Sequence, residues 1–154
     1  MKKPLLILGL VVVGVLILAI WTTGPRGDVS VFDRIWIDQL PSNPKDTGNA
    51  FVAVTKQPMG VFQSASQYKG SYEVFSYKAS GDELQVVYSQ TDDQEKVTAR
   101  ASRCKERDMD YCLELSGATR GVKRYRSRRG WEVDKSTPLE QVLSRVESIV
   151  RPTN

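Results

Sequence analysis

Residues 71–89 read SYEVFSYKASGDELQVVYS and contain the clearest structural signal of the chain. The dipeptide Gly81-Asp82 suits a two-residue β-hairpin turn, because glycine and aspartate accept the positive φ angles that such turns require. With Ser80 opposite Glu83, six apolar residues fall on one face: Phe75, Tyr77, Ala79, Leu84, Val86 and Tyr88. A shift of one residue would scatter them over both faces. The turn and the pattern therefore predict the same antiparallel hairpin.

Turn residues divide the region from Val31 onward into eight β-type segments, two of which form this hairpin. The predicted strands are Val31 to Asp38, Ala50 to Lys56, Val61 to Gln67, Ser71 to Ala79, Leu84 to Tyr88, Glu95 to Cys104, Tyr111 to Ser116 and Thr119 to Arg126. This spacing indicates a mainly β domain of antiparallel strands.

The chain ends with a predicted amphipathic helix over residues 138–150. Thr137-Pro138-Leu139-Glu140 has the pattern of a capping box with proline at the first helical position. Apolar residues then follow at helical spacing: Leu139, Val142, Leu143, Val146 and Ile149. We expect this stripe to cover one side or one end of the sheet.

The chain resembles the lipocalin-like small barrels in its antiparallel segments in meander order, in Trp36 near their start and in an amphipathic helix at their end. The resemblance covers about residues 31–149, and Arg34 stands where the signature of that family has glycine. It implies a small antiparallel β-barrel of about eight strands whose interior holds packed side chains or one small apolar ligand. A two-layer sandwich, or an open antiparallel sheet backed by the helix, is the alternative.

Residues 4–21 contain no charged side chain and follow Lys2 and Lys3. A helix of this length spans about 27 Å, close to the ~30 Å hydrocarbon core of a bilayer. We expect a signal-anchor over residues 1–21, in which a transmembrane helix holds the protein in the bilayer, with a cleaved signal peptide as the alternative. We expect a linker over residues 22–30 to follow, and after it an extracytoplasmic β-rich domain over residues 31–151. The lysines favour a cytoplasmic N-terminus, which would place the domain in the periplasm or outside the cell.

Cys104 and Cys112 are the only cysteines and lie on neighbouring predicted strands. A register that places them opposite each other also pairs Ala101 with Leu115 on the core face and leaves residues 105–111 as the tip. Opposite residues of an antiparallel pair have Cα atoms ~4.5 to 5.5 Å apart, within the range of a disulfide. We therefore expect a disulfide and an oxidising compartment, with two free thiols in a reducing compartment as the alternative.

The chain has 22 Lys plus Arg, 18 Asp plus Glu and no histidine. The absence of histidine disfavours Ser-His and Cys-His catalysis and most zinc sites. Asp92 and Asp93 are adjacent in a predicted turn, whereas glycosidase chemistry needs two carboxylates held apart across a cleft. We expect a protein that is not an enzyme and that uses no cofactor or metal.

The segment over residues 120–131 carries the densest positive charge. Its anion-binding candidates are Arg120, Lys123, Arg124, Arg126, Arg128 and Arg129, and its aromatic contact candidates are Tyr125 and Trp131. Arginine matches the geometry of phosphate and carboxylate groups, and tyrosine and tryptophan suit sugars or a headgroup layer. The alternative is a solvated surface whose cations pair with acids such as Asp92, Asp93, Glu95, Asp108 and Asp110.

The expected function is that of a single-pass membrane protein attached to the bilayer through residues 4–21. Its non-catalytic domain would bind an envelope partner, an anionic envelope polymer or a lipid headgroup, rather than nucleic acid. The alternative, implied by the resemblance, is a carrier that holds a small apolar ligand in the barrel interior.

Overall fold

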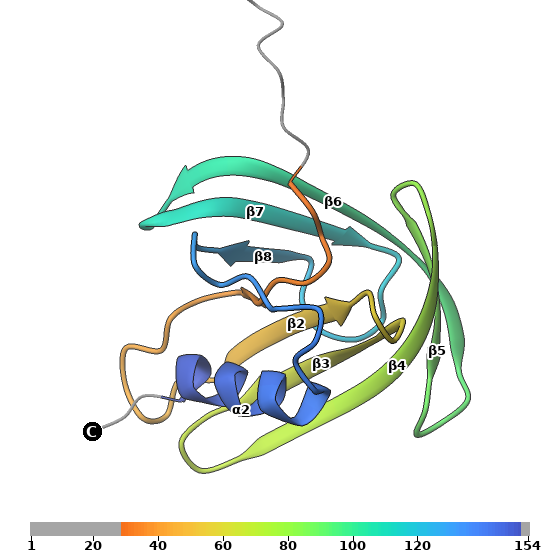
Figure 1. Cartoon of the computed structure of the whole chain (residues 1–154). Helices are drawn as coiled ribbons and strands as arrows, with labels where there is room; N and C mark the ends of the chain where they lie inside the picture. The colour runs from red at the N-terminus through yellow and green to blue at the C-terminus, as the bar shows by residue number, and fades with distance from the viewer. Residues whose placement is uncertain (1–28, 152–154) are drawn as a thin grey trace, which may run out of the picture.

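The computed structural model describes residues 29–151. Eight strands form one antiparallel sheet that closes in a ring, because β1 pairs with both β2 and β8 (Figure 1). The strands are β1 (Trp36–Ile37), β2 (Gly48–Val54), β3 (Met59–Ala65), β4 (Gly70–Ser80), β5 (Glu83–Tyr88), β6 (Gln94–Glu106), β7 (Met109–Ser116) and β8 (Arg124–Ser127). One helix, α2 (Leu139–Val150), follows them. The mainly β prediction is confirmed, and the closed ring excludes the open sheet and the sandwich.

The predicted membrane anchor over residues 1–21 lies outside the described residues, as does most of the predicted linker over residues 22–30. Within residues 29–151, no helix combines the length and the apolar character that crossing a bilayer requires. The anchor and the location of the domain therefore stay predictions.

The hairpin of β4 and β5 has the predicted register, in which Ser80 pairs with Glu83 and Phe75 with Tyr88. Gly81 in its turn has a φ of 59°. Of the apolar side chains predicted for one face, all are buried except Ala79, which lies next to the turn and is exposed. Turn chemistry and apolar pattern together determined this part of the ring.

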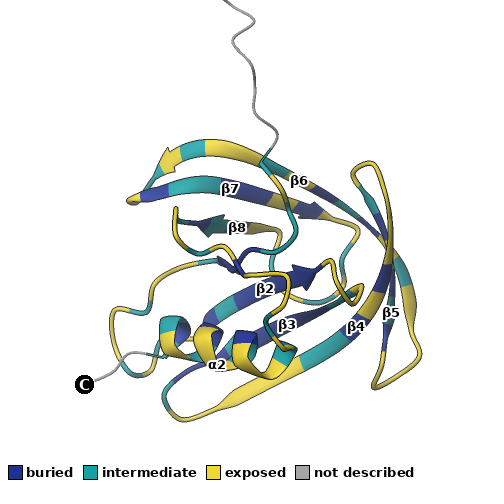
Figure 2. Ribbon diagram, in the orientation of Figure 1, coloured by how far each residue is buried: buried dark blue, intermediate teal, exposed yellow. Residues whose placement is uncertain are grey.

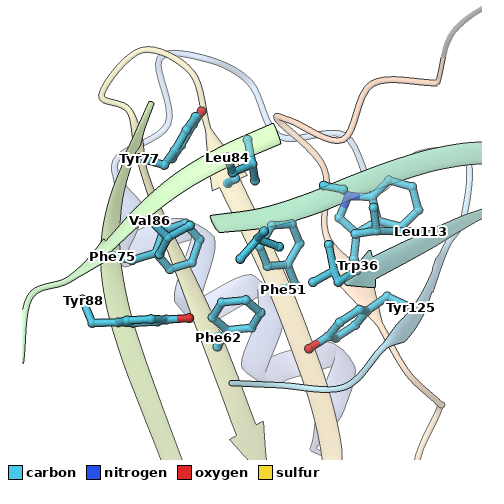
Figure 3. Packing of buried hydrophobic residues seen from close by; sticks show 14 residues of the cluster. Trp36, Phe51, Phe62, Phe75, Tyr77, Leu84, Val86, Tyr88, Leu113 and Tyr125 are labelled. Carbon is cyan, nitrogen blue, oxygen red and sulfur yellow. The ribbon is translucent and has the colours of Figure 1, made fainter. Parts of the chain in front are cut away.

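Fourteen buried side chains fill the interior of the ring (Figure 3). Aromatic rings dominate this interior, and the ring centroids of Phe51 and Phe62 lie 5.1 Å apart. The Trp36 indole donates a hydrogen bond of 2.8 Å to the carbonyl of Val31, which satisfies its only donor. Buried and more exposed residues alternate along β5 (Figure 2), as expected for a sheet with one face on a core.

A second apolar cluster lies on the outside of the ring, where α2 covers β2 and β3 (Figure 1). Val142, Val146 and Val150 of the helix are buried there against outward-facing residues such as Val52 and Val61. The helix therefore covers a side of the sheet, one of the two predicted arrangements. The predicted capping box of this helix is wrong. Pro138 has an extended ψ of 144°, so it takes the N-cap position, without a side-chain cap bond, and the helix begins one residue later than predicted.

Two strands are shorter than predicted because the backbone turns out of the extended conformation. Asp33, with a φ of 54°, interrupts the first segment, so that only Trp36–Ile37 pairs as β1. Gly121, with a φ of 71°, belongs to a loop, and β8 begins only at Arg124.

The connections alternate between the two ends of the ring, because every pair of neighbouring strands is antiparallel. We call proximal the end formed by residues 29–35, the turns 55–58, 81–82 and 107–108, and the chain that follows β8. The distal end is formed by the loops 38–47, 66–69, 89–93 and 117–123. In Figure 1, residues 29–35 lie near the top and the β3–β4 turn lies at the bottom. Phe32 stacks on Tyr77 at 5.3 Å and helps to cover the proximal end.

Candidate functional site

The predicted basic segment does not form one surface, because strand geometry divides it. On β8 the side chains of Tyr125 and Ser127 are buried, while Arg124 and Arg126 face outward. Tyr125 is wholly inside the ring, and its hydroxyl accepts a hydrogen bond of 2.9 Å from the backbone N–H of Val122. Burial raises the pKa of Tyr125 well above its ordinary value. As a contact for a surface ligand, Tyr125 was wrongly predicted.

Arg120 lies at the distal end and its charge is balanced there. Its Nε is 2.9 Å from Glu73 and another guanidinium nitrogen is 2.7 Å from Asp93. The guanidinium also lies 4.3 Å from the centre of the Tyr88 ring, an arrangement typical of a cation–π contact. The hydrogen bond from Arg120 holds the pKa of the Asp93 carboxyl below its usual range. Arg120 therefore closes the distal end of the ring.

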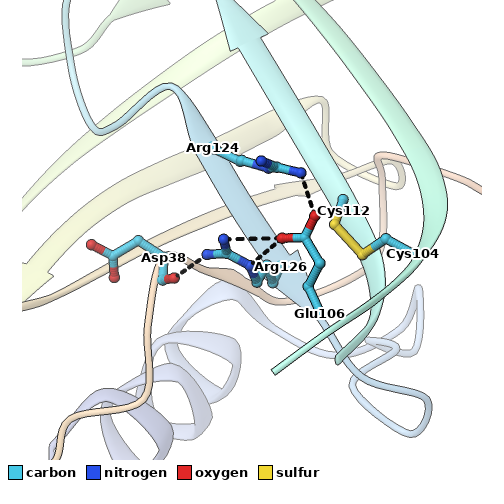
Figure 4. Close-up of a disulfide and its surroundings, with 6 residues drawn as sticks. All are labelled: Asp38, Cys104, Glu106, Cys112, Arg124 and Arg126. Atoms are coloured by element: carbon cyan, nitrogen blue, oxygen red, sulfur yellow. Dashed lines mark hydrogen bonds and ion pairs between the residues drawn. A yellow bond between two sulfur atoms is a disulfide. The ribbon is translucent and has the colours of Figure 1, made fainter. Parts of the chain in front are cut away.

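Arg124 and Arg126 share one acid (Figure 4). Arg124 donates to one carboxylate oxygen of Glu106 at 2.5 Å, and Arg126 lies 3.1 Å from the other oxygen. Arg126 also donates to the backbone carbonyl of Asp38 at 2.9 Å. These two cations thus join β8 to β6 and to the chain after β1, which matches the predicted alternative of paired surface charge.

Cys104 and Cys112 form the predicted disulfide beside this charge cluster, with Cα atoms 5.7 Å apart (Figure 4). The predicted register is wrong by two residues, because Ser102, not Cys104, lies opposite Cys112. Ala101 correspondingly pairs with Leu113 instead of Leu115. An irregularity between Arg103 and Glu106 brings Cys104 back within reach of Cys112.

The tip of this hairpin is also shorter than the predicted 105–111. It consists of Arg107 and Asp108, which have φ angles of 52° and 63°, as a tight two-residue turn requires. The strands therefore extend further, to Glu106 and from Met109, and they project the tip at the proximal end.

The remaining candidates lie apart from one another. Lys123 is exposed in the distal loop. Arg128 is half-buried at the proximal end, with its guanidinium 5.7 Å from the centre of the Trp131 ring. Its Nε is buried without a hydrogen-bond partner among the described residues. Arg129 has an exposed side chain, and its backbone N–H donates to Asp110 at 2.8 Å.

Three further cations lie beside Arg128 and Arg129. Arg103 pairs across the sheet with Tyr111, which in turn pairs with Ser127, so three strands bring Arg103 next to the chain that continues into Arg128. We define the proximal cation cluster as Arg103, Lys105, Arg107, Arg128 and Arg129. Within residues 29–151 none of them lies within ion-pair distance of an acid. Asp108 and Asp110 lower the local charge but leave an excess of cations.

Sequence reasoning overlooked this cluster, although a signal existed. Arg103, Lys105 and Arg107 alternate at the end of one predicted strand and at the tip that follows it. Their relation to Arg128 and Arg129 depends on the pairing of β6, β7 and β8, which the separate segments do not reveal.

Arg34 binds the backbone next to the proximal cation cluster. Its side chain is 10% exposed and donates to the carbonyl of Arg128 at 3.0 Å and to Glu132 at 2.5 Å. Its guanidinium lies 4.2 Å from the centre of the Tyr111 ring. Burial alone would raise the pKa of Glu132, but hydrogen bonds from the backbone and from Arg34 outweigh it and lower that pKa. Arg34 therefore fixes the backbone that presents Arg128.

In the part of the chain that the structure describes, no three His, Cys, Asp or Glu residues are grouped as metal binding would require. Comparisons with models of protein families, with curated proteins and with solved structures found no match.

Proposed function

We propose that the chain is a membrane-anchored, non-catalytic binding protein whose domain lies outside the cytoplasm and contacts anionic lipid headgroups. The contact is made by the proximal cation cluster. One observation carries this proposal: the five cations of the proximal cation cluster, none of them in an ion pair among residues 29–151, lie together at the end of the ring where residue 29 lies, close in sequence to the predicted anchor. The disulfide supports an oxidising, extracytoplasmic location.

The length of chain before the domain keeps this end close to a bilayer. The residues between positions 21 and 29 reach at most about 28 Å when fully extended. Cations close to an anionic membrane surface contribute roughly 1 kcal/mol each, within a screening length of ~8 Å at physiological salt. Several arginines on one end are therefore sufficient for a weak, salt-dependent contact that orients the domain.

In this proposal the closed ring is a lipocalin-like small barrel, and its own side chains fill the interior. Aromatic and aliphatic side chains fill it (Figure 3), and Phe62 contacts the rings of Phe51, Phe75 and Tyr88. A carrier needs a cavity of at least a few hundred Å³ inside the barrel. This packing supports binding at the surface over the carrier alternative.

Vesicle flotation of a domain over residues 29–154 tests the headgroup contact. Both apolar cores are formed by residues of the described part, so this domain retains them. We expect it to float with vesicles that contain phosphatidylglycerol, to do so less as salt is raised, and not to float with phosphatidylcholine alone.

The matched variants remove equal charge from the two ends of the ring. The substitutions Arg107→Gln, Arg128→Gln and Arg129→Gln together should abolish flotation. The substitutions Lys45→Gln, Lys69→Gln and Lys123→Gln remove exposed cations from the distal end and should leave it unchanged. Equal flotation of both triple variants, or equal flotation with neutral vesicles, would refute the proposed contact.

A further inference from the structure

We propose that the second half of β6 binds an extended, acidic segment of a partner protein as an added strand. β5 pairs only with residues 94–98 of β6. β6 continues to Glu106, and there β7 is its only partner strand among residues 29–151. In Figure 1 the hairpin of β6 and β7 extends to the left, away from β5 at the right. The side of residues 100–106 that faces away from β7 is therefore unpaired, and we call it the free edge of β6.

The backbone of Ala101 and Arg103 points to the free edge. Along an antiparallel strand, the N–H and C=O groups of successive residues point to opposite neighbours. The N–H of Ala99 donates to the carbonyl of Asp82 in the β4–β5 turn at 2.8 Å, so the backbone of Ala99 faces the β5 side. Ala101 and Arg103 face the same side, and within residues 29–151 no backbone hydrogen bond joins either of them to a loop. Unpaired backbone groups in a row are a template for another strand.

Positive charge along the free edge determines which kind of strand fits it. Four cations lie at the end of β6 and in the turn after it: Arg100, Arg103, Lys105 and Arg107. The only acid among these positions, Glu106, is already bound by Arg124 and Arg126. Of the four cations, Arg100 alone has an acid partner among residues 29–151, Asp82 at 3.0 Å. Acidic side chains on an added strand would face these cations, and opposite charges on neighbouring strands stabilise their pairing.

A second copy of the chain fits the free edge poorly for the same reason. Two such edges paired antiparallel would bring Arg100, Arg103 and Lys105 beside the same cations of the other copy, and like charges on facing strands are destabilising.

The two faces of β6 indicate the pattern of the added strand. Ala101 packs partly against the interior of the ring, whereas Arg100 and Ser102 face outward and are exposed. Apolar residues of the added strand would therefore lie on the face of Ala101 and acidic residues on the face of Arg100. This contact uses backbone groups of β6 and does not depend on headgroups, although Arg103 and Lys105 also belong to the proximal cation cluster.

Amide hydrogen exchange, measured by NMR on the full chain in micelles of an uncharged detergent, tests the free edge. The probe is a capped peptide of alternating glutamate and valine, about seven residues long and therefore about 23 Å in extended form. An excess of this peptide should slow the exchange of the Ala101 and Arg103 amides at least tenfold. The control is the Tyr72 amide, because residues 70–73 of β4 also extend beyond β5 but carry no cation. No slowing at Ala101 and Arg103, or equal slowing at Tyr72, would overturn the proposal.

N-methylated peptides separate backbone pairing from attraction between charges. Alternate residues of a strand point their N–H groups to the same neighbour, so methylation of the valines blocks one edge of the peptide and methylation of the glutamates blocks the other. One of these peptides should bind as the parent does and the other at least tenfold more weakly. Equal affinity of the two would show that charge alone holds the peptide and would overturn the proposal.

Two kinds of variant test the protein side of the contact. Ala101→Pro removes an N–H from the free edge without changing any charge, and proline is tolerated where the N–H of a strand faces solvent. It should weaken peptide binding at least tenfold, while unchanged amide signals in β2 and β3 show that the ring is folded. Arg128→Gln with Arg129→Gln should reduce vesicle flotation but leave the affinity for the peptide within twofold. Unchanged peptide affinity in Ala101→Pro would refute the strand contact alone, and loss of flotation in the parent domain would refute the headgroup contact alone.

Discussion

At the scale of single residues, two arginines close the two ends of the ring by packing on tyrosines. Arg34 covers Tyr111 at the proximal end, and Arg120 covers Tyr88 at the distal end. Each guanidinium also binds acids distant in sequence: Glu132 lies 98 positions from Arg34, and Glu73 lies 47 positions from Arg120. The planar guanidinium suits this role because it stacks and donates several hydrogen bonds at once.

Replacing Arg34 tests its structural role. We expect Arg34→Met to lower the free energy of unfolding by about 2 kcal/mol. The substitution removes the hydrogen bonds that Arg34 donates to the Arg128 carbonyl and to the Glu132 carboxylate. The cost is less than for a fully buried pair because the Glu132 side chain is 50% exposed and can be hydrated. Arg124→Met, at a side chain that is 48% exposed, should cost less than about 1 kcal/mol. Urea denaturation of the two variants compares them directly, and equal losses would contradict this role.

Gly121 allows the distal loop to approach the interior. A Cβ at this position would lie 2.1 Å from the hydroxyl oxygen of Tyr125 and 2.7 Å from the ring of Phe62. Gly81 also has a positive φ, but nothing lies within 4 Å of a Cβ placed there. We expect Gly81→Ala to cost about 1 kcal/mol from backbone strain alone and Gly121→Ala about 2 to 4 kcal/mol, because overpacking is added. Thermal unfolding of both variants measures the two losses of stability. Equal losses would show that the loop moves freely away from the added methyl group.

At the scale of elements, the sequence predicted where strands form better than how they pair. The β4–β5 register was predictable because the turn allows few alignments and a one-residue slip would expose the apolar face. The β6–β7 register was not, because a shift of two residues keeps every side chain on its face, and the irregularity near Cys104 has no sequence signal. The pairing of three anion-binding candidates was unpredictable for a related reason. The acids that neutralise Arg120, Arg124 and Arg126 lie on strands that are distant in sequence.

The disulfide staples the β6–β7 hairpin. Because it closes a short loop of sequence separation 8, its reduction should lower the free energy of unfolding by about 2 to 3 kcal/mol in the loop-entropy picture while the ring persists. Chemical denaturation with and without a reductant measures this loss. The double variant Cys104→Ala with Cys112→Ala is the control and should be insensitive to reductant. A loss of all β structure on reduction would show that the hairpin cannot hold its register alone.

At the scale of the whole molecule, the interior is closed and the two ends of the surface differ. Residues 29–35 and Arg34 cover the proximal end, and the loop with Arg120 covers the distal end. The five cations of the proximal cation cluster have no ion-pair partner among residues 29–151, whereas Arg120 at the distal end is paired with Glu73 and Asp93.

The buried tyrosines make the stability of the whole ring sensitive to alkali. Burial raises the pKa of Tyr77 to about 12 and raises the pKa of Tyr88 and Tyr125 further. These pKa values exceed the ~10 of tyrosine in an unfolded chain, so the stability is fully present below about pH 10 and is lost as pH rises beyond it. Urea midpoints from pH 8 to 12 should therefore fall. The fall should be shallower in Tyr88→Phe, and an equal slope in this variant would contradict the assignment.

The orientation of the domain on the membrane is the decisive measurement for the proposed headgroup contact. We would place the full chain, labelled with ¹⁵N, in nanodiscs that contain a phosphatidylglycerol fraction and a lipid with a gadolinium chelate at its headgroup. If the proximal cation cluster contacts the headgroups, we expect strong broadening of amide signals at residues 106–109 and 128–130, and little at residues 66–69 and 89–93. Broadening that is equal at both ends, or stronger at residues 66–69, would contradict this contact.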